Sequence, residues 1–217
     1  MDLKGKKFVA SYSGGKDSVF AIFKAIEAGL KPAEMITTFN QKRSWSNNIS
    51  ENLLQKVSSS VAIPLTCIHT SGDLYQENFE KALTASKDRG IEVCVFGDID
   101  LESHIEWCTK RCETVGLIPY FPLWKKNRKK VVYDFIDAGF KSVITIVDAT
   151  RMPEEFLGQV LTREVADAIE KSGADICGEN GEYHTFTFDG PLFSGSVEYV
   201  VKDKKKQGKY IILGDLH

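Results

Sequence analysis

The stretch that decides the fold reads Val9-Ala10-Ser11-Tyr12-Ser13-Gly14-Gly15-Lys16-Asp17-Ser18. The apolar run Phe8–Tyr12 predicts a strand, and the spacing of apolar residues over Ser18–Ala28 predicts a helix. A strand that turns directly into a helix lies at the carboxyl edge of a parallel sheet, where open α/β sheets bind ligands. Gly14 and Gly15 let the backbone turn sharply and approach an anion, and the start of the helix offers N–H groups and a positive dipole end. The stretch therefore predicts a phosphate-binding loop.

Around this stretch, the first half of the chain alternates short apolar runs with helical patterns, which is typical of a parallel sheet covered by helices. Further strands are predicted at Ala33–Phe39, Leu65–His69 and Ile91–Phe96, and helices at Ile49–Ser60, Leu74–Asp88 and Leu101–Val115. The fold class is therefore α/β, with a Rossmann-like parallel sheet, helices on both of its faces, and a smaller α+β C-terminal domain.

The character of the chain changes after its middle. Pro119 and Pro122 break the pattern, and a basic run follows at 125–130. We expect a boundary near Leu123, between a nucleotide-binding domain (1–123) and a substrate-binding C-terminal domain (124–217). In the second domain the patterns predict helices at Val131–Ala138 and Leu161–Lys171, a strand at Lys141–Val147, and closing strands at Phe186–Phe188, Ser196–Val201 and Tyr210–Leu213.

The composition excludes several classes of protein. A formal net charge of -2 over 217 residues gives no reason to expect nucleic acid or an anionic membrane as a partner, so the basic runs 125–130 and 202–206 are expected to be solvated faces. The apolar runs are too short to cross a bilayer, and the N-terminus lacks the apolar region of a signal peptide, which favours a cytoplasmic protein. Five cysteines favour free thiols, and Cys108 and Cys112 are expected to be half-buried rather than metal ligands.

Each side chain of the loop suits a phosphate. Lys16 adds a positive charge, the hydroxyls of Ser13 and Ser18 can donate to phosphate oxygens, and Asp17 can bind magnesium or favour the helix N-terminus. The Walker-type and dinucleotide fingerprints are absent. The alternative is a Gly-Gly turn with a Ser/Asp cap, but six specified residues between a strand and a helix favour phosphate binding. The expected nucleotide contacts are Ser11, Ser13, Gly14, Gly15, Lys16, Asp17, Ser18, Thr38, Gly97 and Asp98.

Ser-Gly-Gly-Lys-Asp-Ser after a first strand is similar to the pyrophosphate loop of the adenine-nucleotide alpha-hydrolase group, the ATP pyrophosphatases. This resemblance implies a HUP-type fold and cleavage of ATP between its α and β phosphates. Residues 176–193 resemble the C-terminal signature of the diphthine–ammonia ligase family, as do Gly97-Asp98-Ile99, Gly116-Leu117 and Pro122-Leu123-Trp124. The resemblance spans nearly the whole chain.

The family resemblance implies ATP-driven amidation of a carboxylate with ammonia, releasing AMP and pyrophosphate. In eukaryotes and archaea the carboxylate belongs to diphthine, a modified histidine of elongation factor 2. The implied partners are ATP with magnesium, ammonia, and a carboxylate on a small molecule or a modified protein side chain. A homodimer is a separate expectation.

The second motif can also be interpreted chemically. Its glycines permit a tight turn that carries Glu179 and Glu182, which with Lys16 are the expected catalytic residues. Paired carboxylates beside a triphosphate can coordinate magnesium, or one can take a proton from ammonium; the alternative is a solvated acidic hairpin. Tyr183 and His184 are expected at the substrate, although His184 also fits a packed or hydrogen-bonding neighbour.

Gly97 and Asp98 end a buried strand and therefore also lie at the ligand edge of the sheet. Gly97 would let the adenosine approach the backbone. Asp98 could bind ribose or magnesium, or it could cap the helix that begins near Leu101. On that helix His104 and Trp107 could face the substrate, with core packing as the alternative for Trp107.

Two stretches on the substrate side depart from the family pattern, namely Trp45-Ser46-Asn47 and Ser103-His104-Ile105. Trp45 and Asn47 are still expected at the substrate, and the departures fit a bacterial relative that acts on a carboxylate other than diphthine. Two other functions stay open. One is an RNA-thiolating enzyme of the same superfamily that uses Cys108 and Cys112, and the other is a non-catalytic adenine-nucleotide-binding domain.

Overall fold

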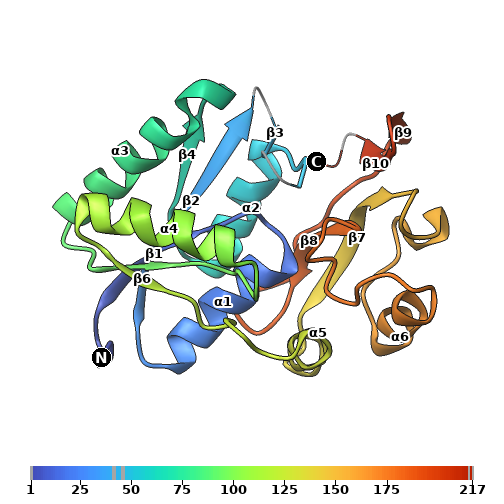
Figure 1. Cartoon of the computed structure of the whole chain (residues 1–217), viewed down its shortest axis with the longest axis horizontal. Helices are drawn as coiled ribbons and strands as arrows, with labels where there is room; N and C mark the ends of the chain where they lie inside the picture. The colour runs from blue at the N-terminus through green and yellow to red at the C-terminus, as the bar shows by residue number, and fades with distance from the viewer. Residues whose placement is uncertain (1, 41–42, 45–46, 215, 217) are drawn as a thin grey trace.

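Five parallel strands form the larger of two sheets in the computed structural model, which describes residues 2–40, 43–44, 47–214 and 216 (Figure 1). The strands lie in the order β4, β2, β1, β5, β6, and a two-residue strand, β3 (Arg43–Ser44), pairs antiparallel with the end of β2. Their bounds are β1 Lys7–Ser11, β2 Lys31–Asn40, β4 Leu65–His69, β5 Val93–Val95 and β6 Ile118–Tyr120. The chain progresses outward in one direction from β1 to β4 and in the other from β5 to β6. The switch point, where such sheets bind ligands, therefore lies between β1 and β5.

Helices cover both faces of this sheet, as the alternation of its buried side chains requires. Val9 of β1 and Cys94 of β5 belong to a core shared with α3 and α4, whereas Phe8 and Ala10 belong to the core on the side of α1 and α2. Figure 1 shows α3 and α4 together on one side of the strands and α1 on the other. The helices are α1 Lys16–Glu27, α2 Glu51–Val61, α3 Tyr75–Asp88, preceded by the 3₁₀ turn η1 Gly72–Leu74, and α4 Glu102–Val115.

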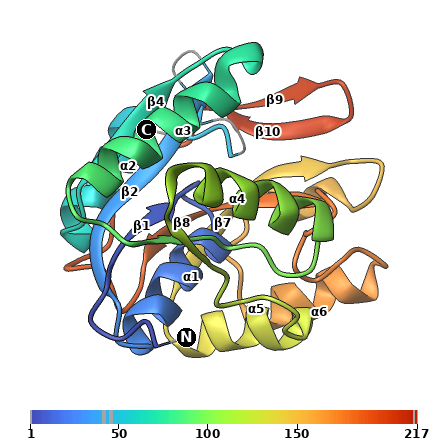
Figure 2. The ribbon, with the colours of Figure 1, turned by 60° about the vertical axis from the view of Figure 1, so that its left-hand side comes forward.

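A four-stranded antiparallel sheet occupies the C-terminal half, in the order β8, β7, β10, β9. Its two helices, α5 and α6, contact each other, and their apolar side chains belong to the same core as those of β7 and β8. Figure 2 shows the hairpin of β9 and β10 extending at one edge of the molecule. The bounds are α5 Arg128–Asp137, β7 Lys141–Asp148, η2 Glu154–Phe156, α6 Arg163–Lys171, β8 Tyr183–Asp189, β9 Asp203–Gln207 and β10 Tyr210–Gly214.

Strand β8 joins the two halves of the molecule. The backbone N–H of Thr187 donates to the carbonyl oxygen of Gly14 at 2.9 Å, and the N–H of Lys16 donates to Oγ1 of Thr185 at 3.0 Å. The halves also share one apolar core, in which Phe20 of α1 meets Phe135 of α5 edge to face, with ring centroids 5.9 Å apart. The loop predicted to bind phosphate is therefore completed by the C-terminal half.

The predicted fold class is confirmed, and three local predictions need correction. No strand forms at 196–201. Tyr199 instead packs on Phe186 and Phe188, and the edge of β10 is taken by the basic stretch of β9, which was expected to be only a solvated face. Helix α1 begins at Lys16 rather than at Ser18. Cys108 and Cys112, expected to be half-buried, are 7% and 0% exposed because they face the core beneath α4.

The division of the chain near residue 123 stays a prediction. No helix in the described ranges has both the length and the apolar character needed to cross a bilayer.

Candidate active site

A cavity of about 700 Å³ opens at the carboxyl ends of β1 and β5, which is the switch point of the large sheet. Its walls come from the loop Ser13–Ser18, called the phosphate-type loop below, from the residues after β5, from the start of α4 and from the turn before β8. It brings together the predicted residues Ser11, Ser13, Gly15, Lys16, Asp17, Ser18, Asn47, Gly97, Asp98, His104, Glu179, Tyr183 and His184. Residues far apart in the sequence thus meet in one site.

The glycines of the loop are required by close packing. Gly14 has a φ of +84°, and a Cβ there would lie 2.7 Å from Ile49 and 2.8 Å from Leu54. A Cβ on Gly15 would lie 2.5 Å from Nδ2 of Asn47. Gly14 does not line the cavity, so its role is to let the loop pack on α2 rather than to approach an anion. Ser13 does face the cavity, and its Oγ lies 3.2 Å from Oγ of Ser18.

Lys16 is tied to the C-terminal half through both its backbone and its side chain. Its ammonium lies 2.7 Å from Oδ2 of Asp17, donates to the carbonyl oxygen of Cys177, and lies 5.3 Å from the centre of the Tyr183 ring. Burial alone would lower the pKa of Lys16, but the Asp17 carboxylate and the neighbouring Tyr183 and Cys177 outweigh it and raise that pKa. The lysine, which is 5% exposed, is therefore a buried, charged link between the loop and the second motif.

Three carboxyl groups, those of Asp17, Asp98 and Glu179, line one wall of the cavity. Burial, and then the charge of Asp17, raise the pKa of Glu179 to about 7. Burial also raises the pKa of Asp17, and Asp98 adds to the shift. Oδ1 of Asp17 is buried and has no hydrogen-bond partner among the described residues. This wall therefore concentrates negative charge that a cation or a proton would relieve.

The two glutamates of the second motif have different roles. Glu179 faces the cavity, and its Oε1 accepts from the backbone N–H of Ile99 at 3.4 Å. Glu182 turns back instead: its Oε2 accepts from the backbone N–H of Asn180 at 3.2 Å, and its Oε1 accepts from Nδ2 of Asn180 at 3.3 Å. Glu182 does not line the cavity and is 7% exposed, so its position does not support the predicted catalytic role, and its hydrogen bonds to Asn180 hold the turn.

Arg128 of α5 holds the turn at its base. Its guanidinium binds both oxygens of Asp100 at 2.8 and 2.6 Å, and Nη1 donates to Oδ2 of Asp175 at 2.7 Å. Asp175 in turn accepts the backbone N–H groups of Cys177 at 3.2 Å and Glu179 at 2.8 Å. A residue that the sequence placed in a solvated basic run thus fixes the backbone of Glu179. No local pattern could have revealed this contact.

The residues after β5 make contacts that the sequence did not predict. Nδ1 of His104 lies 3.1 Å from Oδ1 of Asp98, and this hydrogen bond raises the pKa of His104. Asp98 does not cap α4, because the N-cap is Leu101. A Cβ on Gly97 would lie 2.8 Å from the carbonyl group of Asp17, so the glycine lets the start of α1 abut this strand.

Several predicted contacts lie elsewhere or act differently. Thr38 is buried in β2 outside the cavity lining, and Trp107 packs on Tyr75 and Phe79 with ring centroids 5.7 and 5.6 Å away. Asn47 braces the loop: its Nδ2 donates to Oγ of Ser13 at 3.3 Å and to the carbonyl oxygen of Thr185 at 3.0 Å. Trp45 lies outside the described residues.

His184, which was predicted to contact the substrate, is neutral at pH 7 because burial, aided by the charge of Lys16, lowers its pKa to about 4. The cavity also contains residues that the sequence did not single out. Phe96, Leu101, Arg151 and Asn180 line the cavity without having been predicted. Asn180 lies within the recognised 176–193 motif and Phe96 directly precedes Gly97, whereas Arg151 lies in an irregular segment after β7 that carries no motif.

Comparisons with known proteins match both halves of the chain. Residues 6–119 match the model of the diphthamide synthase N-terminal domain, and residues 127–213 match that of the diphthamide synthase C-terminal domain. Proteins named diphthine–ammonia ligase from Homo sapiens and Danio rerio are 26% and 24% identical to this chain. These matches cover 88% of this chain and 82% and 85% of those proteins. The ligase of the same name from Schizosaccharomyces pombe is 27% identical over 92% of this chain and 36% of its own length.

A solved structure, described as a predicted subunit of tRNA methyltransferase from Methanocaldococcus jannaschii, covers 86% of this chain and 98% of its own. Its TM-score of 0.48 and 13% identity are too low to support any functional statement. The two family models, in contrast, cover both halves of the chain in the expected order. The chain therefore belongs to the diphthamide synthase family.

Proposed function

We propose that this protein is an ATP-dependent amide ligase that activates a carboxylate as an acyl adenylate and then joins it to ammonia. The observation that carries the proposal is the position of Glu179, a carboxyl group with a pKa of about 7, beside a loop suited to phosphate binding. A group whose pKa lies near the working pH is well suited to proton transfer. The names of the curated relatives support ligase chemistry of this kind.

In the first step, an oxygen of the acceptor carboxylate attacks the α phosphorus of ATP. The bond from that phosphorus to the oxygen that bridges it to the β phosphate breaks, and pyrophosphate leaves. The positive end of α1 and the hydroxyl groups of Ser13 and Ser18 face the region where this charge develops. The amide of Lys16 donates to Thr185, so it is the side-chain charge of Lys16 that offsets the phosphates.

The acidic wall fits magnesium, which takes oxygen ligands and is usually held by one or two carboxylates together with substrate phosphates. Asp17, with its buried and unpartnered Oδ1, and Asp98 would hold the ion. Two protein carboxylates leave the remaining coordination positions of the ion for phosphate oxygens and water. Bound magnesium would neutralise part of the triphosphate charge.

In the second step, the nitrogen of ammonia attacks the acyl carbon, and the bond from that carbon to the phosphate oxygen of AMP breaks. The new C–N bond leaves a positive charge on nitrogen, and a proton from it passes to the carboxylate of Glu179. Asp175 and Arg128 hold the backbone of Glu179 in place for this transfer. AMP leaves as an anion, and the product is the amide.

The two alternatives fit the site less well. A thiolating enzyme would need a reactive thiol at the nucleotide, but none of the described cysteines lines the cavity, and burial raises the pKa of Cys108 and Cys177. A domain that only binds nucleotide has no use for a carboxyl group held near neutrality. The stretch Ser103–Ile105 departs from the family pattern, and its His104 lines the cavity. If this stretch sets the specificity, the acceptor is a carboxylate other than diphthine.

The test is product analysis with magnesium, ATP, ammonium and a panel of acids that includes elongation factor 2 carrying diphthine. We expect AMP and pyrophosphate to form in equal amounts, dependent on both the acid and ammonia, with the amide detected by mass spectrometry. Formation of ADP and phosphate instead would overturn the proposal.

A further inference from the structure

Arg151 stands out among the cavity residues because it is a cation with accessible donors. Apart from Lys16, it is the one arginine or lysine lining the cavity within the described ranges, and its side chain is 45% exposed. Lys16 is buried and paired with Asp17. The guanidinium of Arg151 is therefore the more exposed of the two cations that line the cavity.

Contacts on two sides hold the side chain of Arg151 in position. Asp148, at the end of β7, is fully buried, and its Oδ2 lies 2.7 Å from Nζ of Lys209 and 3.7 Å from Nε of Arg151. Oδ1 of Asp148 accepts from Oγ1 of Thr150 at 2.6 Å. On its other side, Nη1 of Arg151 donates to the carbonyl oxygen of Asn180 in the acidic turn. These contacts orient the guanidinium and leave donors for a ligand, since arginine carries five N–H groups.

The charges around the cavity are unevenly distributed. The wall formed by Asp17, Asp98 and Glu179 repels a carboxylate, although the proposed reaction must bring one to the α phosphorus. Arg151, which follows β7, and His184 of β8 are the part of the lining contributed by the C-terminal sheet, whereas the three carboxyl groups come from the loop, the residues after β5 and the acidic turn. A guanidinium binds a carboxylate through two parallel hydrogen bonds, which also fixes its orientation.

We infer that Arg151 is the anion subsite for the acceptor: it receives the carboxylate that is to be adenylated, and Asp148 holds it in place. This inference rests on the proposed function, because it assigns the acceptor end of the same cavity. Phosphate is the other anion that a guanidinium binds, so the experiment must distinguish the acceptor from the nucleotide.

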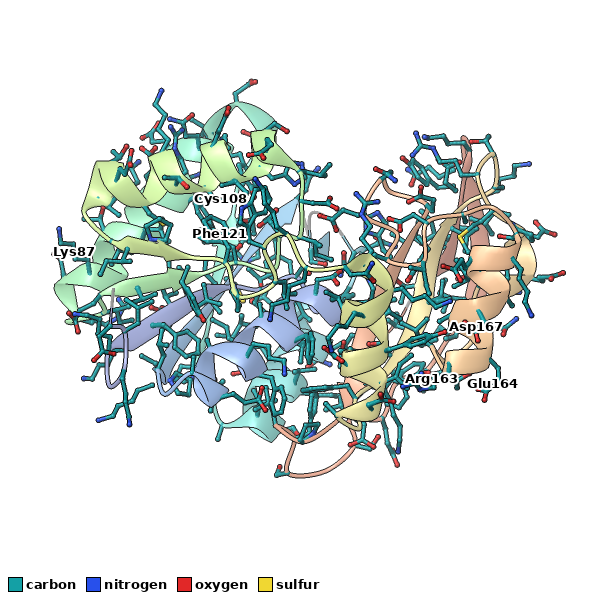
Figure 3. The ribbon with its side chains drawn as sticks, turned by 60° about the horizontal axis from the view of Figure 1, so that its bottom comes forward. Lys87, Cys108, Phe121, Arg163, Glu164 and Asp167 are labelled. Atoms are coloured by element: carbon teal, nitrogen blue, oxygen red, sulfur yellow. The ribbon has the colours of Figure 1, made fainter. Side chains whose placement is uncertain are left out.

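The experiment follows the side-chain Nε–H signal of Arg151 by NMR in the labelled full-length protein, with the signal assigned through the Arg151→Lys variant. One arm titrates AMP-saturated protein with acetate, succinate, glutarate and a short peptide with a free carboxyl terminus. The other arm adds magnesium with ATP, or pyrophosphate, and no acid. Arg163 of α6 is the control, since it is 46% exposed, is paired with an aspartate, Asp137, and does not line the cavity. Figure 3 shows it on α6 together with Glu164 and Asp167.

We expect at least one acid to shift the Arg151 signal saturably, while the Arg163 signal stays fixed and the nucleotide arm leaves Arg151 unchanged. In Arg151→Gln, acid binding followed on the ring signals of His184 should weaken at least about tenfold, with the affinity for ATP unchanged within about twofold. Arg163→Gln should change neither.

A shift of Arg151 with pyrophosphate or ATP alone would overturn the inference and make Arg151 a phosphate contact. No response to any acid would also overturn it and leave Arg151 as a brace for the acidic turn. Both results concern binding, so they are separate from the outcome of the AMP assay: a protein that binds acids at Arg151 but forms no AMP would contradict the proposed reaction alone.

Discussion

The two regions that face each other across the cavity are held by different forces. The loop from Ser13 to Ser18 is fixed by close packing, since Cβ atoms on its two glycines would meet other side chains at 2.5–2.8 Å. The acidic turn at 178–182 is fixed by charges, because Arg128 and Asp175 anchor its base and Glu182 bonds back to Asn180. Packing is insensitive to pH, whereas charge networks titrate. We therefore expect changes at the loop to affect binding and stability, and changes at the turn to affect catalysis and its pH dependence.

The largest effect should come from Glu179→Gln, which removes the proposed proton acceptor and keeps its shape. Amide formation should fall about 100- to 10,000-fold, with the affinity for ATP unchanged. Glu182→Gln is the matched comparison from the same turn. It should cost less than about tenfold, because it loses only turn-holding hydrogen bonds. Single-turnover AMP release measures both, and a larger loss in Glu182→Gln would reverse the assigned roles.

Lys16→Met should lower stability as well as nucleotide binding, because Lys16 links the two regions. It would leave the half-buried carboxylate of Asp17, whose side chain is 27% exposed, without its partner, at a cost of about 1–3 kcal/mol in the free energy of unfolding. Lys81→Met removes a lysine from an exposed pair with Glu77 and should cost less than about 1 kcal/mol. Urea denaturation compares the two. Equal stability of both variants would show that Lys16 does not serve as a structural link.

The pH dependence of catalysis should follow the acidic turn. The pKa of Glu179 is raised to about 7 by burial and by Asp17, so the carboxyl group is protonated and cannot accept a proton below that pH. At fixed concentrations of un-ionised ammonia and magnesium, amide formation should fall as the pH drops from 8 to 5, because the raised pKa leaves an increasing share of Glu179 protonated. ATP binding should fall much less over this range. A profile that is flat from pH 5 to 8 would remove Glu179 as the base.

Gly97→Ala tests the packed region with a single methyl group. The new Cβ would lie 2.8 Å from the backbone carbonyl of Asp17 and 2.9 Å from the backbone nitrogen of Ser18, so the start of α1 must move. We expect a loss of about 1–3 kcal/mol in stability and weaker ATP binding. Gly195→Ala is the control, since nothing lies within 4 Å of its Cβ position. Thermal melts of both variants would show whether the contact is as tight as described.

The smallest effect on catalysis should come from replacing Cys108 and Cys112 together with alanine. Both thiols are buried beneath α4, and Figure 3 shows Cys108 on this helix, in the same part of the molecule as Phe121. Stability should fall by about 1–3 kcal/mol, while AMP release per folded molecule stays within about twofold. Loss of AMP release in a folded double variant would revive the thiolating alternative.

Sequence reasoning worked where one short stretch determines its own structure. The loop and its position between β1 and α1 follow from the spacing of Ser13, the glycines and the apolar residues around them. Sequence reasoning could not tell which of Glu179 and Glu182 faces the cavity, because their orientations depend on the turn conformation and on Arg128. Arg128 lies 47 residues from Asp175, the residue through which it holds the turn. Gly178 also shapes the turn conformation, since it has a positive φ and a Cβ there would lie 2.8 Å from the Tyr183 ring.

Other failures have the same cause. Arg151 lies in a segment without periodicity, and only the pairing of β7 with β8 brings it to the cavity. The strand β9 is a run of exposed, mostly basic residues that becomes a strand because β10 offers it a complete antiparallel ladder. Such long-range pairings leave no mark on the local pattern. Trp45 lies outside the described residues, so its predicted contact with the substrate stays a prediction.

The bonds from β8 to Gly14 and Lys16 have a consequence for how the protein is made. A nascent chain that has left the ribosome only as far as β6 contains every residue of the loop but lacks the strand that completes it. We therefore expect the loop to reach its final conformation only after β8 has been synthesised and has paired with it. We also expect a chain truncated before β8 to lack a completed loop, and a protease that removes β8 to remove these contacts.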